Sequence, residues 1–270
     1  MKNLKISGLF IYPVKSLPGI STDTAELVET GFKNDRKWMI IDENNTFISQ
    51  RKHPELALLH VNLTDEGFNI SDRAGKVGAL FLPFNAAGNK LEAVIWDDKV
   101  KAVDCGNLPD QWFSEYLKQR VKLVYMPAET ERHVDSRFAK NKEITSFTDG
   151  FPLLIIGLSS LDDLNRRLKQ KVTINRFRPN IVFSGGEPYE EDNWHEFRIG
   201  GLNFMVVKPC ARCTITTVDP DTGFKGKEPL ATLASYRSVE NKVMFGQNVI
   251  HSDRGFVSTG DCITIVSAGN

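Results

Sequence analysis

Short apolar segments, each closed by turn residues, dominate this sequence and constrain its fold more than any other feature. Turn signals such as Asp65-Glu66-Gly67 and Gly185-Gly186 lie between them. Many short strands of this kind favour β-barrel or β-sandwich units over a doubly wound sheet. The segments with the length and composition of strands are residues 4–14, 36–42, 56–64, 78–84, 90–96, 121–126, 180–185, 204–208 and 262–267.

Helical periodicity is sparse. Residues 108–120 carry an aromatic and apolar stripe, residues 159–170 begin with two serines that suit a helix cap, and residues 229–237 begin with a proline. We therefore expect a mixed α/β, strand-dominated fold with a few helices. The amphipathic segment 108–120 marks a boundary, which predicts two β-rich domains at residues 1–120 and 121–268.

The charge balance excludes some classes of protein. Lys plus Arg and Asp plus Glu both number 34, and nucleic-acid or anionic membrane binding requires an excess of positive charge. The first residues have no signal-peptide pattern, and no apolar run approaches the roughly 18 residues that span a bilayer. We expect neither a nucleic-acid nor a membrane partner.

The four cysteines are too few for a disulfide framework in a chain of 270 residues. A reducing cytoplasm is therefore the expected location. In that setting the pair Cys210 and Cys213 is more often a metal, redox or catalytic feature than a bridge. No second Cys or His pair has the spacing of a zinc knuckle, and strand-like sequence on both sides does not fit a thioredoxin motif.

Cys213 is the candidate of most interest. Arg212 next to it is expected to favour the thiolate, a soft ligand for a metal already held by sulfur. From spacing alone, a buried structural cysteine fits equally well, and nothing in the spacing separates Cys213 from Cys210.

Other polar segments are candidates only when taken together. Each alone reads as an ordinary turn, loop or protein ion pair. They are Lys15-Ser16 within YPVKSLPG, Asp35-Arg36, Gln50-Arg51, SFTDGFP at 146–152, and Arg176 with Arg178 before an apolar strand. An arginine leading into a buried strand needs an anionic partner, either a protein carboxylate or a ligand phosphate.

Several of these segments, in this order, resemble MOSC-domain proteins. The matching runs are YPVKSLPG, NDRKW, FRPNIVFSGG, CARCTITTVDPDTG, KEPLATLASYR and MFGQN. The resemblance covers nearly the whole chain and is closest to the subgroup with an N-terminal β-barrel extension, the amidoxime-reducing components and their bacterial YcbX-type relatives. It implies a MOSC β-barrel domain preceded by a β-barrel-like domain.

The resemblance implies a molybdenum cofactor, in which molybdopterin supplies a dithiolene and a protein cysteine supplies a third sulfur. The cysteine directly before TITTVDPDTG is Cys213, so the resemblance assigns the metal to Cys213 and not to Cys210. By motif, the other cofactor-binding residues are Lys15, Ser16, Arg36, Thr148, Asp149, Gly150, Arg178, Asn180 and Arg212. Asp149 is also the candidate catalytic proton donor, by position only. Asn248 stands where some members carry Tyr, which puts a role there in doubt.

The family's activity is the reduction of N-hydroxylated compounds: hydroxylamines, amidoximes and N-hydroxylated bases. The sequence carries no cysteine cluster for the ferredoxin-like domain that some relatives have. We therefore expect a separate electron donor: a flavin reductase, a ferredoxin or a b5-type cytochrome.

Two alternatives use the same cysteine. A molybdenum-cofactor sulfur transferase would carry a persulfide on Cys213 and, in this pyridoxal-phosphate-free chain, would need a partner desulfurase. A cofactor carrier would bind molybdopterin but reduce no N-hydroxylated substrate. Bound molybdopterin with molybdenum supports the reductase, and a persulfide without metal supports sulfur transfer.

Overall fold

The fold is organised around a β-sheet that contains strands from both ends of the chain. The computed structural model describes residues 3–84 and 88–269. Within them, a nine-stranded sheet has the order β19-β14-β15-β17-β12-β13-β1-β2, with β16 paired to β17. Its strands are β1 (Lys5–Ile11), β2 (Ile20–Thr22), β12 (Leu153–Gly157), β13 (Ile181–Ser184), β14 (Trp194–Ile199), β15 (Leu202–Arg212), β16 (Ser238–Val239), β17 (Lys242–His251) and β19 (Ile263–Ala268).

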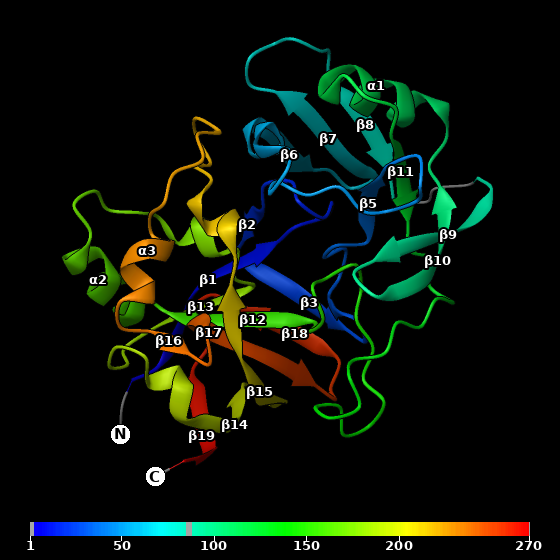
Figure 1. Ribbon diagram of the computed structural model, residues 1–270. Coiled ribbons are helices and arrows are strands. Elements are labelled where there is room, and N and C mark those ends of the chain that lie inside the picture. The colour runs from blue at the N-terminus through cyan, green and yellow to red at the C-terminus, as the bar shows by residue number, and fades with distance from the viewer. Residues whose placement is uncertain (1–2, 85–87, 270) are drawn as a thin grey trace.

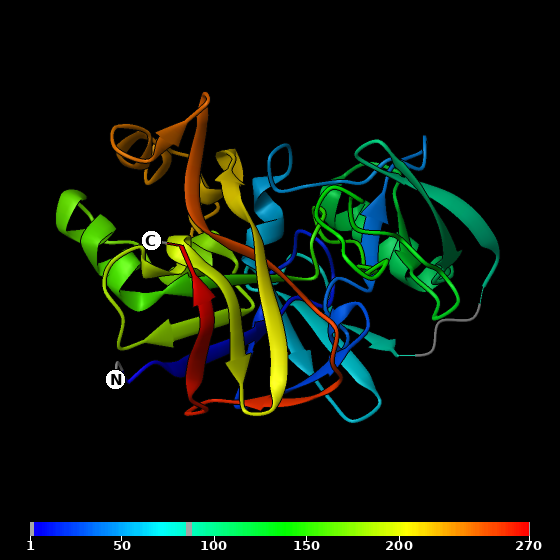
Figure 2. The same ribbon diagram turned by 90° about the horizontal axis from the view of Figure 1, so that it is seen from below.

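Three smaller sheets complete the architecture (Figure 1). One consists of β5 (Trp38–Ile41), β11 (Lys122–Tyr125), β10 (Asp98–Asp104) and β9 (Lys90–Ile95). The others are β18 (Gly255–Ser258) with β3 (Thr24–Val28) and β4 (Gly31–Phe32), and β6 (Leu59–Leu63) with β7 (Gly67–Asp72) and β8 (Leu80–Pro83). Figure 2 shows the sheet of β5 and β9–β11 lying beside the larger mass formed by the nine-stranded sheet.

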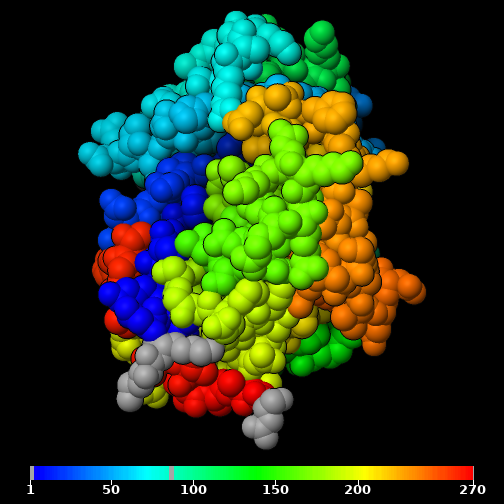
Figure 3. Space-filling model, turned by 90° about the vertical axis from the view of Figure 1, so that its left-hand side faces the viewer, coloured from blue at the N-terminus to red at the C-terminus, as the bar shows by residue number. Residues whose placement is uncertain are grey.

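Helices lie at the periphery. They are α1 (Asn107–Leu117), α2 (Leu158–Arg167), α3 (Leu230–Ala234) and the 3₁₀ turns η1 (Pro54–Leu58), η2 (Ile174–Phe177), η3 (Glu190–Asn193) and η4 (Thr214–Thr217). Figure 3 shows α2 on one face beside the segment that contains α3. Among residues 3–84 and 88–269, no helix is both long and apolar enough to cross a membrane.

Two of the hydrophobic cores explain why β1 and β5 form where they do. In β1 the side chains of Ile6, Leu9 and Ile11 are buried against β13 and the rest of the large sheet. In the second core, the Trp38 ring of β5 lies 4.8 Å from Phe68 and 5.0 Å from Tyr125, measured between ring centroids. Full burial of such side chains stabilises the fold by about 1.5–3 kcal/mol each.

The prediction of a strand-dominated fold with an N-terminal β-rich part is confirmed. Each predicted strand segment overlaps a strand, and each predicted helical segment overlaps an α-helix. The segment 56–64 differs at its start, where Leu56 and Ala57 belong to η1 and the strand begins only at Leu59. Strands absent from the predictions include β12, β17 and the edge strands β2 and β16.

The sheets draw their strands from both predicted domain ranges. The strand β11 begins just after the predicted boundary, yet it pairs with β5 and β10. In turn, β1 pairs with β13, and β3 pairs with β18. The division into residues 1–120 and 121–268 stays a prediction.

We expect Trp38→Ala to lower the free energy of unfolding by about 3–5 kcal/mol, because it removes a fully buried ring from a packed aromatic cluster. Chemical denaturation measures this change. Phe256→Ala is the control: Phe256 is an exposed aromatic residue on β18, and its removal should change the unfolding free energy by about 0.5 kcal/mol or less. Equal effects of the two substitutions would contradict the assigned core.

Candidate functional site

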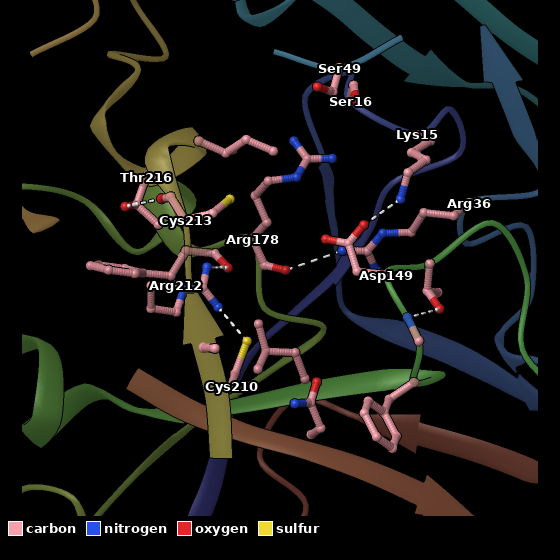
Figure 4. Close-up of a pocket in the computed structure, with 18 of the residues that line it drawn as sticks. Lys15, Ser16, Arg36, Ser49, Asp149, Arg178, Cys210, Arg212, Cys213 and Thr216 are labelled. Atoms are coloured by element: carbon pink, nitrogen blue, oxygen red, sulfur yellow. Dashed lines mark hydrogen bonds and ion pairs between the residues drawn. The ribbon is translucent and has the colours of Figure 1, made fainter. Parts of the chain in front are cut away.

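All ten residues that the motifs single out line one cavity of about 260 Å³ (Figure 4). The cavity lies between the end of β15, the loop that follows β1, the loop before β12 and the turn before β13. These elements come from distant parts of the chain, and the pairing of β1 with β13 and of β12 with β17 brings them together. The residues are Lys15, Ser16, Arg36, Thr148, Asp149, Gly150, Arg178, Asn180, Arg212 and Cys213.

Cys213 ends the extended backbone of β15 and begins the 3₁₀ turn η4. Its carbonyl accepts hydrogen bonds from the backbone N–H and the hydroxyl of Thr216, at 3.2 and 2.9 Å. Its side chain is exposed, and Figure 4 shows it directed toward Arg178. The thiol is thus presented to the cavity by a turn whose backbone is fixed internally.

The cation predicted to act on Cys213 contacts the other cysteine. Arg212 Nη1 donates to Cys210 Sγ at 2.9 Å, and Nη2 donates to the carbonyl of Phe177 at 2.6 Å. The reason is the strand itself, because residues two apart in a strand share a face while neighbours point to opposite faces. Adjacency in sequence therefore does not place the Arg212 guanidinium on Cys213, and the expected thiolate at Cys213 stays a prediction.

The loop after β1 places Lys15 and Ser16 on the opposite side of the cavity. Ser16 has a left-handed φ of 72°, and its backbone is held because its carbonyl accepts from Gln50 Nε2 at 2.6 Å while its hydroxyl donates to the carbonyl of Ile48. The side chain of Lys15 is only 8% exposed, and its ammonium lies 2.6 Å from Asp149 Oδ1.

This ion pair sets the charge of both groups. Burial lowers the pKa of Lys15, and the Asp149 carboxylate opposes that shift. Partial desolvation by the surrounding protein raises the pKa of Asp149, whose side chain is 67% exposed, but the charge and hydrogen bond of Lys15 and the hydrogen bond from the Trp96 indole lower it more. The net pKa of Asp149 lies below its usual range, so the carboxylate is ionised at neutral pH.

A buried carboxylate that the motifs did not assign holds Arg36. Asp35 Oδ2 lies 2.5 Å from Arg36 Nη1, and Asp35 Oδ1 accepts from the backbone N–H of Tyr12 at 2.8 Å. Arg36 donates further to Asn180 Oδ1 and to the carbonyl of Arg178. Burial raises the pKa of Asp35, and Arg36 opposes this rise.

The charge of Arg178 is not paired within the part of the protein that the structure describes. Its backbone is left-handed, with φ 55°, and its guanidinium lies 4.4 Å from the centroid of the Tyr12 ring. Among the described residues it has no carboxylate partner and no side-chain hydrogen bond. In Figure 4 it extends into the space between Cys213 and Ser16. A buried or half-buried cation without a partner is costly, so this group favours an anionic ligand.

A second unpartnered donor supports the same conclusion. The Nε of Arg212 is buried and has no hydrogen-bond partner among the described residues. Together with Arg178, it gives the cavity two donors that the protein itself does not satisfy. The donor set therefore fits a ligand that carries phosphate, as molybdopterin does.

Other predicted residues are already bonded within the protein. The amide of Asn180 donates to the carbonyl of Phe10 and accepts from the backbone N–H of Leu154. The Thr148 hydroxyl is 2.7 Å from the Thr145 hydroxyl. Both line the cavity, but their roles toward a cofactor stay predictions, as do those of the other eight residues.

Sequence reasoning missed several groups of the cavity and its supports. Arg132 is buried and donates to the carbonyls of Ser146 and Thr148, which orders the loop that carries Asp149. Lys208 lines the cavity from β15. Asn248, whose role the motif left in doubt, lines it from β17. No pattern in the sequence pointed to Arg132, because its partners, the carbonyls of Ser146 and Thr148 and the Asp98 carboxylate, are distant in sequence. Among the described residues, no group of three or more His, Cys, Asp or Glu side chains is placed to hold a metal ion.

Comparison with known proteins gives two family matches. The model described as "MOSC N-terminal beta barrel domain" matches residues 3–120, and the "MOSC domain" model matches residues 142–264. Mitochondrial amidoxime-reducing component 1 of Mus musculus is 34% identical, covering 97% of this chain and 82% of its own. Mitochondrial amidoxime reducing component 2 of Bos taurus is 38% identical, covering 86% of this chain and 72% of its own.

A solved structure, the YUAD protein from Bacillus subtilis, is 12% identical, covers 96% of this chain and 93% of its own, and has a TM-score of 0.44. That likeness is too low to carry an argument. The two curated relatives are both named mitochondrial, which contradicts the expectation of a cytoplasmic protein.

We expect Asp35→Asn to lower the free energy of unfolding by about 3–5 kcal/mol, because it leaves the Arg36 charge buried without a counter-charge. Chemical denaturation of both proteins measures the change. Glu26→Gln is the matched control, because it breaks the exposed pair of Glu26 with Lys33 and should cost about 1 kcal/mol or less. Similar losses from the two substitutions would contradict the structural role of Asp35.

We expect Asp149→Asn to make the free energy of unfolding less sensitive to acid pH. Because the pKa of Asp149 is lower in the folded protein than in the unfolded chain, ionised Asp149 stabilises the fold above about pH 4. That contribution is lost as the pH falls through the folded pKa. The free energy of unfolding, measured from pH 6 down to about pH 2, should therefore fall less steeply in the variant. Parallel pH profiles would contradict the assigned ion pair.

Proposed function

The chain belongs to the family of MOSC-domain proteins with an N-terminal β-barrel domain, and from this premise we propose that it is a molybdenum-cofactor-dependent oxidoreductase that reduces N-hydroxylated compounds. The resemblance read from the motifs is confirmed by the two family models and by the relatives named amidoxime-reducing components. An amidoxime carries an N–OH group, which sets the substrate class. The observation that carries the proposal is one exposed thiol facing a cavity with unsatisfied cationic donors.

We assign the metal to Cys213 and the phosphate-bearing end of the cofactor to the donors that the protein leaves unsatisfied. Cys213 offers a soft sulfur ligand, and Arg178 and the Nε of Arg212 offer charge and hydrogen bonds to phosphate. When bound, the molybdenum cofactor supplies the two-electron chemistry that removes the oxygen of an N–OH group. The overall reaction consumes two electrons and two protons and releases water.

Asp149 orients the substrate in this proposal. Its Oδ1 is taken by Lys15 and by the Trp96 indole at 3.2 Å, which leaves Oδ2 as an acceptor toward the cavity. An ionised Oδ2 accepts a hydrogen bond from the hydroxyl or amino group of a hydroxylamine or amidoxime. The depressed pKa favours this acceptor role at rest, and the prediction of Asp149 as proton donor stays a prediction.

Electrons come from a separate protein, as they do for amidoxime reductases. We propose a flavin reductase, a ferredoxin or a b5-type cytochrome as that donor. Each can be tested by reconstitution with the purified chain and a chosen electron source.

We expect Cys213→Ser to lose molybdenum and more than about 100-fold in the rate of benzamidoxime reduction, since outer-shell changes alone typically cost 10–100-fold. Metal analysis and an assay with a competent donor measure both. Cys262→Ser is the control: Cys262 is also an exposed free cysteine, but it does not line the cavity. Full activity of Cys213→Ser with retained molybdenum would contradict the assignment.

The same protein preparation distinguishes a reductase from a sulfur transferase. Mass spectrometry of the intact protein would detect a persulfide on Cys213, and extraction would detect molybdopterin. Molybdopterin with molybdenum supports the reductase. A persulfide without metal, with no reduction of benzamidoxime, would favour the sulfur transferase instead.

A further inference from the structure

The side chains of Arg51, Phe47 and Trp96 pack together beside the cavity, and none of them is assigned to the cofactor. Arg51 and Phe47 line the cavity. The guanidinium carbon of Arg51 lies 4.2 Å from the centroid of the Trp96 ring and 5.7 Å from that of Phe47. The Phe47 and Trp96 centroids are 5.0 Å apart. We call these three side chains the ring stack.

We propose that the ring stack is a binding subsite for the planar part of the substrate, so that the protein prefers N-hydroxylated compounds whose N–OH-bearing group is attached to an aromatic or heteroaromatic ring over those in which it is attached to an alkyl group. This inference rests on the proposed function and adds a substrate class to it.

The charge of Arg51 is available to a ligand. Its one side-chain hydrogen bond in the described residues is Nε to Ser49 Oγ at 3.3 Å, and it has no carboxylate within ion-pair distance there. Trp96 lies against its guanidinium, and Arg51 itself borders the cavity. A guanidinium attracts planar π systems stacked on it and donates in its plane to ring nitrogens or carbonyls.

The backbone of Trp96 adopts a conformation that is unfavourable for a tryptophan. It follows β9 at the tip of the β9–β10 hairpin with a left-handed φ of 56°, where Gly or Asn is favoured. For a residue with a Cβ this conformation costs roughly 1–2 kcal/mol. Trp96 is nevertheless 42% exposed, so burial does not fully offset that cost. Strain of this kind concentrates at ligand-binding positions.

The ring stack is continuous with the polar part of the site. The Trp96 indole and the Lys15 ammonium donate to the same oxygen of Asp149. Lys15 also lies 5.3 Å from the Phe47 centroid. A ring bound on Arg51 and Phe47 therefore lies next to the carboxylate that accepts from its N–OH or amino group. Neighbouring aromatic rings attract at centroid distances of about 4.5–7 Å.

The test compares two substrates with the same reacting group. Benzamidoxime and acetamidoxime differ in a phenyl ring against a methyl group, and both are offered to the holoenzyme with one electron donor. We expect Trp96→Ala to lower the ratio of kcat/KM for benzamidoxime to that for acetamidoxime about tenfold, within the range for loss of one stacked ring. The change should lie in KM for benzamidoxime.

Two conservative variants and two controls sharpen the test. Trp96→Phe keeps the ring and removes the hydrogen bond to Asp149, so it should keep most of the ratio. Arg51→Lys keeps the charge and removes the planar group, so it should lower the ratio severalfold. Phe81→Ala, at an aromatic residue 44% exposed on β8, and Arg73→Lys, at an arginine paired with Asp221, should leave the ratio unchanged.

A direct binding measurement separates this inference from the proposed function. Benzamidoxime should quench tryptophan fluorescence in the natural protein and not in Trp96→Phe. If the natural protein reduces acetamidoxime but Trp96→Ala and Arg51→Lys affect both substrates equally, the reductase stands and the ring subsite is wrong. If it reduces neither substrate yet the Trp96-dependent quenching occurs, the reductase is wrong and the ring-binding site stands. Absence of both quenching and selectivity overturns the inference.

Discussion

One buried carboxylate holds the candidate site together. Asp35 accepts from the backbone of Tyr12 and from Arg36, and Arg36 extends the contact to Asn180 and to the carbonyl of Arg178. The loop after β1, the turn after β4 and the start of β13 therefore share one ionic centre. Because a buried charge is tolerated only with its partners in place, these three segments cannot move independently. Arg36 and Arg178 both have left-handed backbone conformations, and their guanidinium groups lie 4.1 and 4.4 Å from the centroid of the Tyr12 ring.

The strands that could be predicted are those whose residue composition and flanking turns are typical of a strand. In β5, a run of β-branched and aromatic residues follows a turn, and the strand lies where that run predicts it. By contrast, β12 is buried along its whole length between β13 and β17, so it has no alternation to distinguish it from a buried helix. In β17, polar residues such as Gln247 and Asn248 interrupt the apolar pattern because they bond to Asp192 and to the carbonyl of Lys208. Such tertiary partners are not visible in the order of residues.

The members of the site could be predicted, but their electrostatics could not. Motif order brought ten residues to one cavity, including Cys213 at the end of β15. Adjacency in sequence suggested that Arg212 acts on Cys213, whereas the Arg212 side chain contacts Cys210, two residues away on the strand. The unpartnered state of Arg178 and the support from Arg132 depend on which side chains and carbonyls fold against them. These properties need the structure.

Asp149 shows how tightly charge is balanced in the cavity. Protonation of this carboxylate would leave the ammonium of Lys15, only 8% exposed, without its counter-charge. The cost of that state helps to lower the pKa of Asp149, so the carboxylate stays ionised at neutral pH. Asp149 Oδ1 accepts from Lys15 and from the Trp96 indole, so both donors meet on one oxygen. Lys15 is therefore the residue that keeps Asp149 a hydrogen-bond acceptor at the edge of the cavity, and a role of Asp149 as proton donor stays a prediction.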